Sequence, residues 1–131
     1  MEEVHSHGWH FILHSCGKIN DLLPFFMDVG VDMMNMAQPQ VYGIHELGAR
    51  FAGKMAFLTT CDIQTTLPGG DRNAIAAEAE ELIRNWSTPQ GGMVVFNYGM
   101  GNAIGVNEDM TRFMFKEFDK RKSFWQAKRR P

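Results

Sequence analysis

Residues 11–17 read Phe-Ile-Leu-His-Ser-Cys-Gly, a short apolar run that ends in polar residues and a glycine. A run bounded in this way is typical of a strand that is buried on both faces. Similar runs recur at residues 31–36, 54–60 and 93–96, and an amphipathic segment follows each of them. Four strands that alternate with four helices predict an α/β fold with a parallel sheet and right-handed crossovers.

The predicted helices cover residues 20–29, 43–52, 72–86 and 108–118. The third is the clearest, because its apolar residues form one stripe at helical spacing: Ile75, Ala79, Leu82, Ile83 and Trp86. Asp71 and Asn107 are expected to cap the last two helices. Pro39 is expected to close the second strand, and residues 68–71 are expected to form a turn.

The composition fits one soluble domain that spans residues 1–131. The chain is 44% hydrophobic and 21% charged, with a net charge of −2. Residues 1–5 lack the features of a signal peptide, and no apolar run approaches the roughly 20 residues of a membrane helix. With only Cys16 and Cys61, a disulfide framework is not expected, which favours a reducing cytoplasm.

Charge is distributed unevenly along the chain. Seven of the 13 Lys and Arg residues lie between Lys116 and Arg130, whereas residues 1–115 carry 6 basic and 13 acidic side chains, a net charge of −7. A basic tail can contact phosphates, or it can be the last turns of a terminal helix, where cations suit the helix dipole. No nucleic-acid motif accompanies the tail, so we expect the helical role and no nucleic-acid partner.

The alternation of strands and helices leaves two architectures open, a small doubly wound sheet and part of a (β/α)8 barrel. In both, chemistry gathers where strands end and helices begin. Polar residues follow every predicted strand here: His14 and Cys16, Asn35 and Gln38, Cys61 and Asp62, and Asn97 to Asn102.

His14 and Cys16 stand two residues apart, so their side chains point the same way if the strand continues through them. An imidazole and a thiolate side by side are good zinc ligands. A buried cysteine is more often a small hydrophobic residue, and a histidine at a strand end often only forms hydrogen bonds. From these two residues alone, the structural interpretation is favoured.

Several motifs in order resemble the uroporphyrinogen decarboxylase superfamily: residues 14–19, 29–32, 60–70 and 91–92, and 99–101 through to Glu108. The resemblance covers nearly the whole chain. It implies a (β/α)8 barrel, of which this chain is the C-terminal half, (β/α)4, because complete members are about twice as long. One branch of the superfamily decarboxylates uroporphyrinogen without a cofactor. The other moves a methyl group between a corrinoid and a thiol held on zinc.

The resemblance to the methyltransferase branch implies that His14 and Cys16 are zinc ligands. Its third ligand is a cysteine at the end of the last strand, where this chain has Met100, and a thioether is a poor zinc ligand. Cys61, at the end of the preceding strand, is the alternative third ligand. Because Met100 stands in place of the expected cysteine, any zinc is expected to bind weakly. Asp62 and Gln64 are the candidates for orienting the substrate.

The decarboxylase alternative requires a basic pocket for a substrate with many carboxylates. Only Lys18 and Arg72 lie near the predicted strand ends, so a methyltransferase is favoured over a carboxy-lyase, and we expect the chain alone to be inactive. The third alternative is a non-catalytic half-barrel. Half a barrel exposes two sheet edges, so the expected partner is a second copy or an N-terminal half-barrel. The methyltransferase resemblance adds a corrinoid protein as a possible partner. No association with a membrane is expected.

Overall fold

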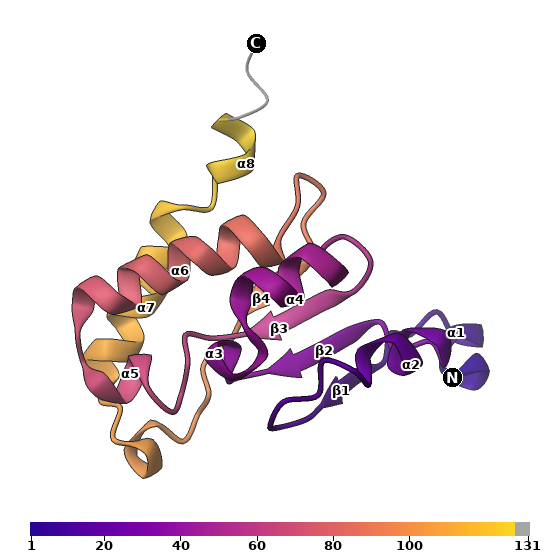
Figure 1. Ribbon diagram of the computed structural model, residues 1–131, viewed down its shortest axis with the longest axis horizontal. Coiled ribbons are helices and arrows are strands. Elements are labelled where there is room, and N and C mark those ends of the chain that lie inside the picture. The colour runs from indigo at the N-terminus through magenta and orange to yellow at the C-terminus, as the bar shows by residue number, and fades with distance from the viewer. Residues whose placement is uncertain (128–131) are drawn as a thin grey trace.

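A single parallel sheet organises the chain, with its strands in the order β1-β2-β3-β4 (Figure 1). The strands are β1 (Ile12–His14), β2 (Met33–Met36), β3 (Ala56–Thr59) and β4 (Met93–Val95). The structure is a computed structural model, and it describes residues 1–127. Strands that follow one another in the chain are also neighbours in the sheet. The described residues therefore contain no reversal of strand order, the feature that marks a doubly wound sheet.

The predicted alternation of strands and helices is confirmed. The helices are α1 (Glu2–Ser6), α2 (Leu23–Asp28), α3 (Pro39–Tyr42), α4 (Ile44–Phe51), α5 (Thr66–Gly69), α6 (Arg72–Trp86), α7 (Glu108–Lys120) and α8 (Phe124–Ala127), with a 3-10 turn at Gly101–Ile104. The short helices α3 and α5 were not predicted. Pro39 begins α3 instead of only closing a strand, because proline suits the first helical position, where its missing N–H has no partner to lose.

The predicted helix caps are present. The Asp71 side chain accepts hydrogen bonds from the backbone N–H groups of Asn73 and Ala74, and the Asn107 side chain accepts one from Met110. Each bond satisfies an amide that has no partner within its helix. These caps fix the starts of α6 and α7, the two longest helices.

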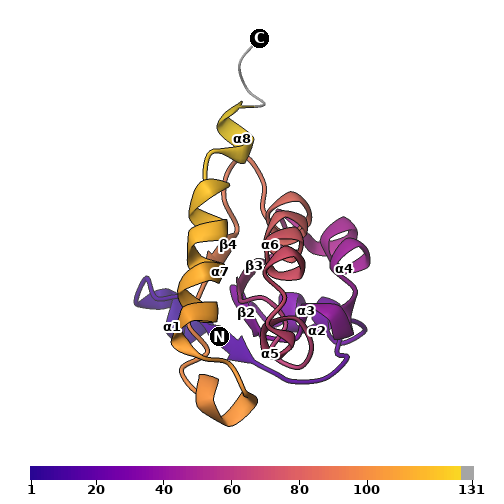
Figure 2. The same cartoon turned by 90° about the vertical axis from the view of Figure 1, so that its left-hand side faces the viewer.

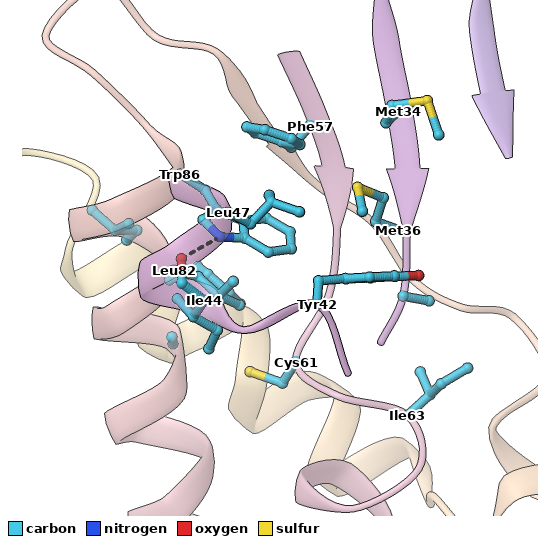
Figure 3. Packing of buried hydrophobic residues seen from close by; sticks show 14 of the residues in the cluster. Met34, Met36, Tyr42, Ile44, Leu47, Phe57, Cys61, Ile63, Leu82 and Trp86 are labelled. Carbon is cyan, nitrogen blue, oxygen red and sulfur yellow. Dashed lines mark hydrogen bonds between the residues drawn. The ribbon is translucent and has the colours of Figure 1, made fainter. Parts of the chain in front are cut away.

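Side chains on one face of the sheet are fully buried under the helices. The Trp86 ring lies 5.0 Å from the Phe57 ring of β3 and 6.4 Å from the Tyr42 ring, and Met34 and Met36 of β2 belong to the same buried cluster (Figure 3). The indole N–H of Trp86 donates to the carbonyl oxygen of Ile44 at 2.9 Å, so its one polar group is satisfied in the core. The largest buried side chains therefore lie between the sheet and α4 and α6.

The opposite face of the sheet is not buried. We call it the open face, and it consists of the alternate strand residues: Ile12, His14, Met33, Asn35, Ala56, Leu58 and Val94. The two edge strands are the most exposed, with Ile12 and Val94 at 50% and 47% exposure. Figure 2 shows α4 and α6 on the same side of the strands. The hydrophobic core thus occupies one side of the sheet.

Helix α6 packs between α4 and α7. At the α6–α7 contact, the guanidinium of Arg121 binds Glu117 at 2.7 Å and Glu80 at 3.6 Å, and Lys120 also binds Glu117. These cations hold the pKa of the Glu117 carboxyl below its usual range. The predicted helical role of the basic segment is confirmed through Lys120, and residues 128–130 lie outside the described residues.

No helix within residues 1–127 has both the length and the apolar character needed to cross a membrane.

Candidate functional site

The carboxyl ends of the parallel strands meet at one edge of the sheet, to the left of the arrowheads in Figure 1. The strands are in register there, because His14 is level with Asn35 and Met36 is level with Thr59. Loops that leave this edge carry the polar residues predicted from the sequence. This edge is where active sites of parallel α/β folds form.

The structure brings His14 and Cys16 into contact at the end of β1. The imidazole Nε2 lies 3.4 Å from the Cys16 Sγ, and both side chains are exposed. The expected orientation of the pair, with both side chains on the same side, is therefore present. A thiol and an imidazole at this distance can share a proton or bind one electrophile together.

The loop that carries this pair is held from two neighbouring elements. The backbone N–H of Gly17 donates to the side-chain oxygen of Gln38 at 2.8 Å, and the Tyr42 hydroxyl donates to the Ser15 carbonyl at 3.3 Å. Gly17 has a φ of +76°, a conformation that favours glycine. Burial raises the pKa of Tyr42 to about 12, so its hydroxyl remains a donor at neutral pH. These contacts keep Cys16 beside His14.

The distance between the two donor atoms fits a shared zinc ion. Zinc binds nitrogen at about 2.0 Å and thiolate sulfur at about 2.3 Å, so two such ligands at a tetrahedral angle lie roughly 3.5 Å apart. The observed separation is 3.4 Å. Within the described residues, however, no group of three or more His, Cys, Asp and Glu side chains could hold a metal. The pair fits as two donors of a ligand set and not as a complete set.

Cys61, the alternative third ligand, lies elsewhere. Its side chain is fully buried, and its Sγ contacts the Ile75 carbonyl oxygen of α6 at 3.7 Å (Figure 3). Burial raises the pKa of the Cys61 thiol, and the nearby carboxyls of Glu78 and Asp62 raise it further. A protonated thiol facing a helix is a packing residue. The structure does not bring Cys61 to the His14–Cys16 pair.

Asp62, predicted to orient a substrate, instead organises its own loop. Its Oδ1 accepts hydrogen bonds from the backbone N–H groups of Gln64 and Thr65 and from the Thr65 hydroxyl, at 2.8 to 3.0 Å. Its Oδ2 accepts one from the backbone N–H of Gln40 at 3.2 Å, which ties the end of β3 to α3. The side chain is fully buried, whereas the Gln64 side chain is exposed in the same loop.

Sequence reasoning missed Glu78, a buried acid next to this loop. Its Oε1 accepts a 3.2 Å hydrogen bond from the backbone N–H of Asp62, and burial raises its pKa to about 7. A signal was present in the sequence. Position 78 lies three residues after Ile75 and four before Leu82, so it falls on the apolar stripe of α6.

The loop after β4 forms an open hollow with the start of α7. The hollow is about 610 Å³, and its lining includes Asn97, Met100, Asn102, Glu108 and Arg112. Met100 is 61% exposed there. Arg112 pairs with Glu108 at 2.9 Å, so its charge is already balanced within the helix. This hollow contributes polar groups to the mouth of the sheet and no thiol or imidazole.

Comparison of the chain with protein-family models, curated proteins and solved structures finds no match. The topology of the sheet and the geometry of the His14–Cys16 pair are therefore the observations that bear on function.

Proposed function

We propose that this chain is one half, (β/α)4, of a (β/α)8 barrel related to the uroporphyrinogen decarboxylase superfamily. We further propose that its His14–Cys16 pair belongs to a zinc-thiol centre for methyl transfer. The observation that carries the second part is the 3.4 Å contact between Nε2 of His14 and Sγ of Cys16 at the carboxyl end of β1. The first part is supported by the topology of the sheet.

The half-barrel proposal is supported by strand order and by burial. A (β/α)8 barrel repeats one pattern, in which each strand lies beside its predecessor and the helices cover only the outer face. The described residues follow that pattern for four strands. The open face would then line the barrel interior. Four further strands, from the same polypeptide or from another chain, would cover Ile12 and Val94.

The chain's own residues would bind and position a thiol centre. His14 and Cys16 would hold the metal, with a third donor from outside the described residues. Gln38 and Tyr42 would keep the loop of Cys16 in place through their contacts with Gly17 and Ser15. A zinc ion bound there supplies the deprotonation of a substrate thiol at neutral pH.

The donor of the methyl group would be a corrinoid carried by a partner protein at the same edge of the sheet. Gln64 is exposed in the loop after β3 and is available to orient the acceptor, while Asp62 fixes the path of that loop. Because the described residues supply only two metal donors, the chain alone is expected to bind metal weakly and to be inactive.

Cobalt(II) titration of the purified chain tests the metal part of the proposal. Cobalt occupies zinc sites, and thiolate coordination adds a near-ultraviolet absorption band. We expect one weak site whose band is lost in Cys16→Ser and strongly reduced in His14→Ala. Cys61→Ser is the matched control and should keep the band, because Cys61 faces α6. Absence of a thiolate band in the wild type, or a band that depends on Cys61, would overturn the proposed site.

A further inference from the structure

Exposed apolar side chains gather at the two ends of the sheet. Eight large hydrophobic residues within residues 1–127 are strongly exposed: Trp9, Ile12, Leu22, Phe25, Val29, Val94, Met100 and Phe115. Six of them belong to the edge strands β1 and β4 or to the helical segments that follow those strands. Exposed apolar residues that cluster in this way mark an interaction surface.

Both edge strands also have unpaired backbone groups on their outer sides. In β1, the Phe11 carbonyl and the Ser15 N–H bond to β2, so the alternate residues Ile12 and His14 direct theirs outward. In β4, the Gly92 carbonyl and the Phe96 N–H bond to β3. The backbone N–H and carbonyl groups of Met93 and Val95 therefore point outward. Such edges pair readily with another strand.

Beside β1, the segment that forms α2 carries an exposed apolar stripe. Leu22, Phe25 and Val29 are spaced i, i+3 and i+7 and are 50%, 60% and 41% exposed. Leu23 is fully buried on another flank of the same helix, so the stripe faces away from the hydrophobic core.

Beside β4, α7 exposes Phe115 in the same manner. Its flank toward α6 carries Phe113, which stacks with Arg72, and Glu117, whose partner Arg121 reaches Glu80. Phe115 points to the other flank and is 37% exposed. It shares a hollow with Met93 at the start of β4, so it lies near the amino-terminal edge of the sheet.

The two ends carry opposite charge at the same level of the sheet. Val29 shares a hollow with Glu2, Glu3 and Asp28, three acidic residues near the amino-terminal edge. Phe115 shares a shallow hollow with Asp119 and two lysines, Lys116 and Lys120. One end is therefore apolar and acidic, and the other is apolar with an excess of basic groups.

We infer that a second copy of this chain binds both ends at once and forms a twofold dimer. The β1 strand of each copy lies beside β4 of the other, the α2 stripe packs against Phe115 of the second copy, and Glu2, Glu3 and Asp28 face Lys116 and Lys120 of the second copy. The eight strands then close into one barrel that buries the open face. This inference rests on the half-barrel part of the proposed function and not on the metal site.

Sedimentation velocity on the full 131-residue chain tests the inference. The wild type should be a dimer at micromolar concentration. Charge reversal on one side, Lys116→Glu with Lys120→Glu, should raise the dimer dissociation constant about tenfold or more, because several charge pairs become repulsive. Lys120 also pairs with Glu117, so the circular dichroism spectrum of this variant must stay native. Reversal on the other side, Glu2→Lys with Glu3→Lys and Asp28→Lys, should do the same.

Mixing the two variants should restore the dimer, because both interfaces of a mixed dimer regain opposite charges. Phe25→Asp, a change at an exposed position, should abolish the dimer while the circular dichroism spectrum stays native. Glu81→Lys on the exposed side of α6 is the control and should leave the dimer intact. A folded wild-type monomer, or variants that fail to recover on mixing, would overturn the inference. Cobalt titration of the same samples reports separately on the metal proposal.

Discussion

Glu78 and Asp62 form a buried link between α6 and the end of β3, in which Oε1 of Glu78 accepts a 3.2 Å hydrogen bond from the backbone N–H of Asp62. The other carboxyl oxygen of Glu78 has no hydrogen-bond partner among the described residues. Burial, together with the negative charge of Asp62, raises the pKa of Glu78 from its ordinary value of 4.5 to about 7, although the hydrogen bond from the Asp62 N–H lowers it. A buried carboxylate with an unsatisfied oxygen opposes folding once it ionises.

Stability should therefore fall as Glu78 ionises. The folded state holds this proton more tightly than the unfolded state, so the free energy of unfolding should decline as the pH rises from about 4.5 to about 7 and should level above that. Glu78→Gln removes the titration and should stabilise the protein at pH 8 by roughly 1–3 kcal/mol, because its buried amide still lacks a partner on one side. Urea unfolding at several pH values measures this. Glu81→Gln, which changes an exposed residue of the same helix, should leave the decline in the free energy of unfolding unchanged. If the decline persisted in Glu78→Gln, it could not be due to the ionisation of Glu78.

Asp32 should give the opposite pH dependence at acid pH. Its carboxylate accepts hydrogen bonds from the backbone N–H of Phe11 and from His5, which lower its pKa to about 2. The folded state here binds the proton less tightly than the unfolded state. The contribution of Asp32 to the free energy of unfolding is thus fully present above about pH 4 and is lost as the pH falls toward 2.

At neutral pH, Asp32→Asn should cost on the order of 1 kcal/mol, because solvent screens part of the interaction. Acid unfolding followed by circular dichroism compares this variant with Asp21→Asn, which changes a fully exposed aspartate just before α2. Equal acid midpoints in the two variants would count against a role for Asp32.

The fold was predictable where local sequence signals agree with the final structure. The apolar runs and the stripe of α6 identify strands and helices because a buried face must repeat with the period of its element. The short helix α3 was missed because it depends on a distant contact, and α5 was missed because residues 68–71 were predicted to form only a turn. The start of α3 is tied to Asp62, 22 residues away from Gln40, and no local pattern reports such a bond.

The candidate site was predictable in part for the same reason. A spacing of two residues along a strand was enough to place His14 beside Cys16. The contacts that hold this loop could not be predicted, because Gln38 and Tyr42 reach it from other elements of the fold. The direction of Cys61 could have been inferred. It stands two residues after Thr59, a buried residue on the helix-covered face of β3. Side chains two residues apart in a strand share a face, so Cys61 is expected to point toward the helices as Thr59 does.

Gly48 marks the closest approach of α4 to α6. A Cβ atom on Gly48 would lie 2.3 Å from the backbone carbonyl oxygen of Asn85, a distance at which the helices must move apart. Gly48→Ala should therefore destabilise the protein by roughly 1–3 kcal/mol, despite the better helix propensity of alanine. Gly69→Ala is the matched control, because a Cβ there meets no atom within 4 Å. Thermal unfolding of both variants tests the pair, and equal melting temperatures would refute the close contact.

The chain alone should not decarboxylate uroporphyrinogen. That substrate carries many carboxylates, and a site for it must supply positive charge that offsets their desolvation. Among the described residues near the strand ends, Lys18 and Arg72 are exposed cations, and the charge of Arg112 is balanced by Glu108 at 2.9 Å. Residues 1–115 carry a net charge of −7 from 6 basic and 13 acidic side chains, so the mouth of the sheet lies in an acidic part of the chain. A dimer would duplicate these same loops and would add no further kind of cation.

Substrate depletion by the purified chain, measured against a heat-denatured sample, should not exceed the background rate. Depletion above that background, and its loss in His14→Ala, would show that the strand-end loops form a decarboxylase site and would reverse our preference for methyl transfer.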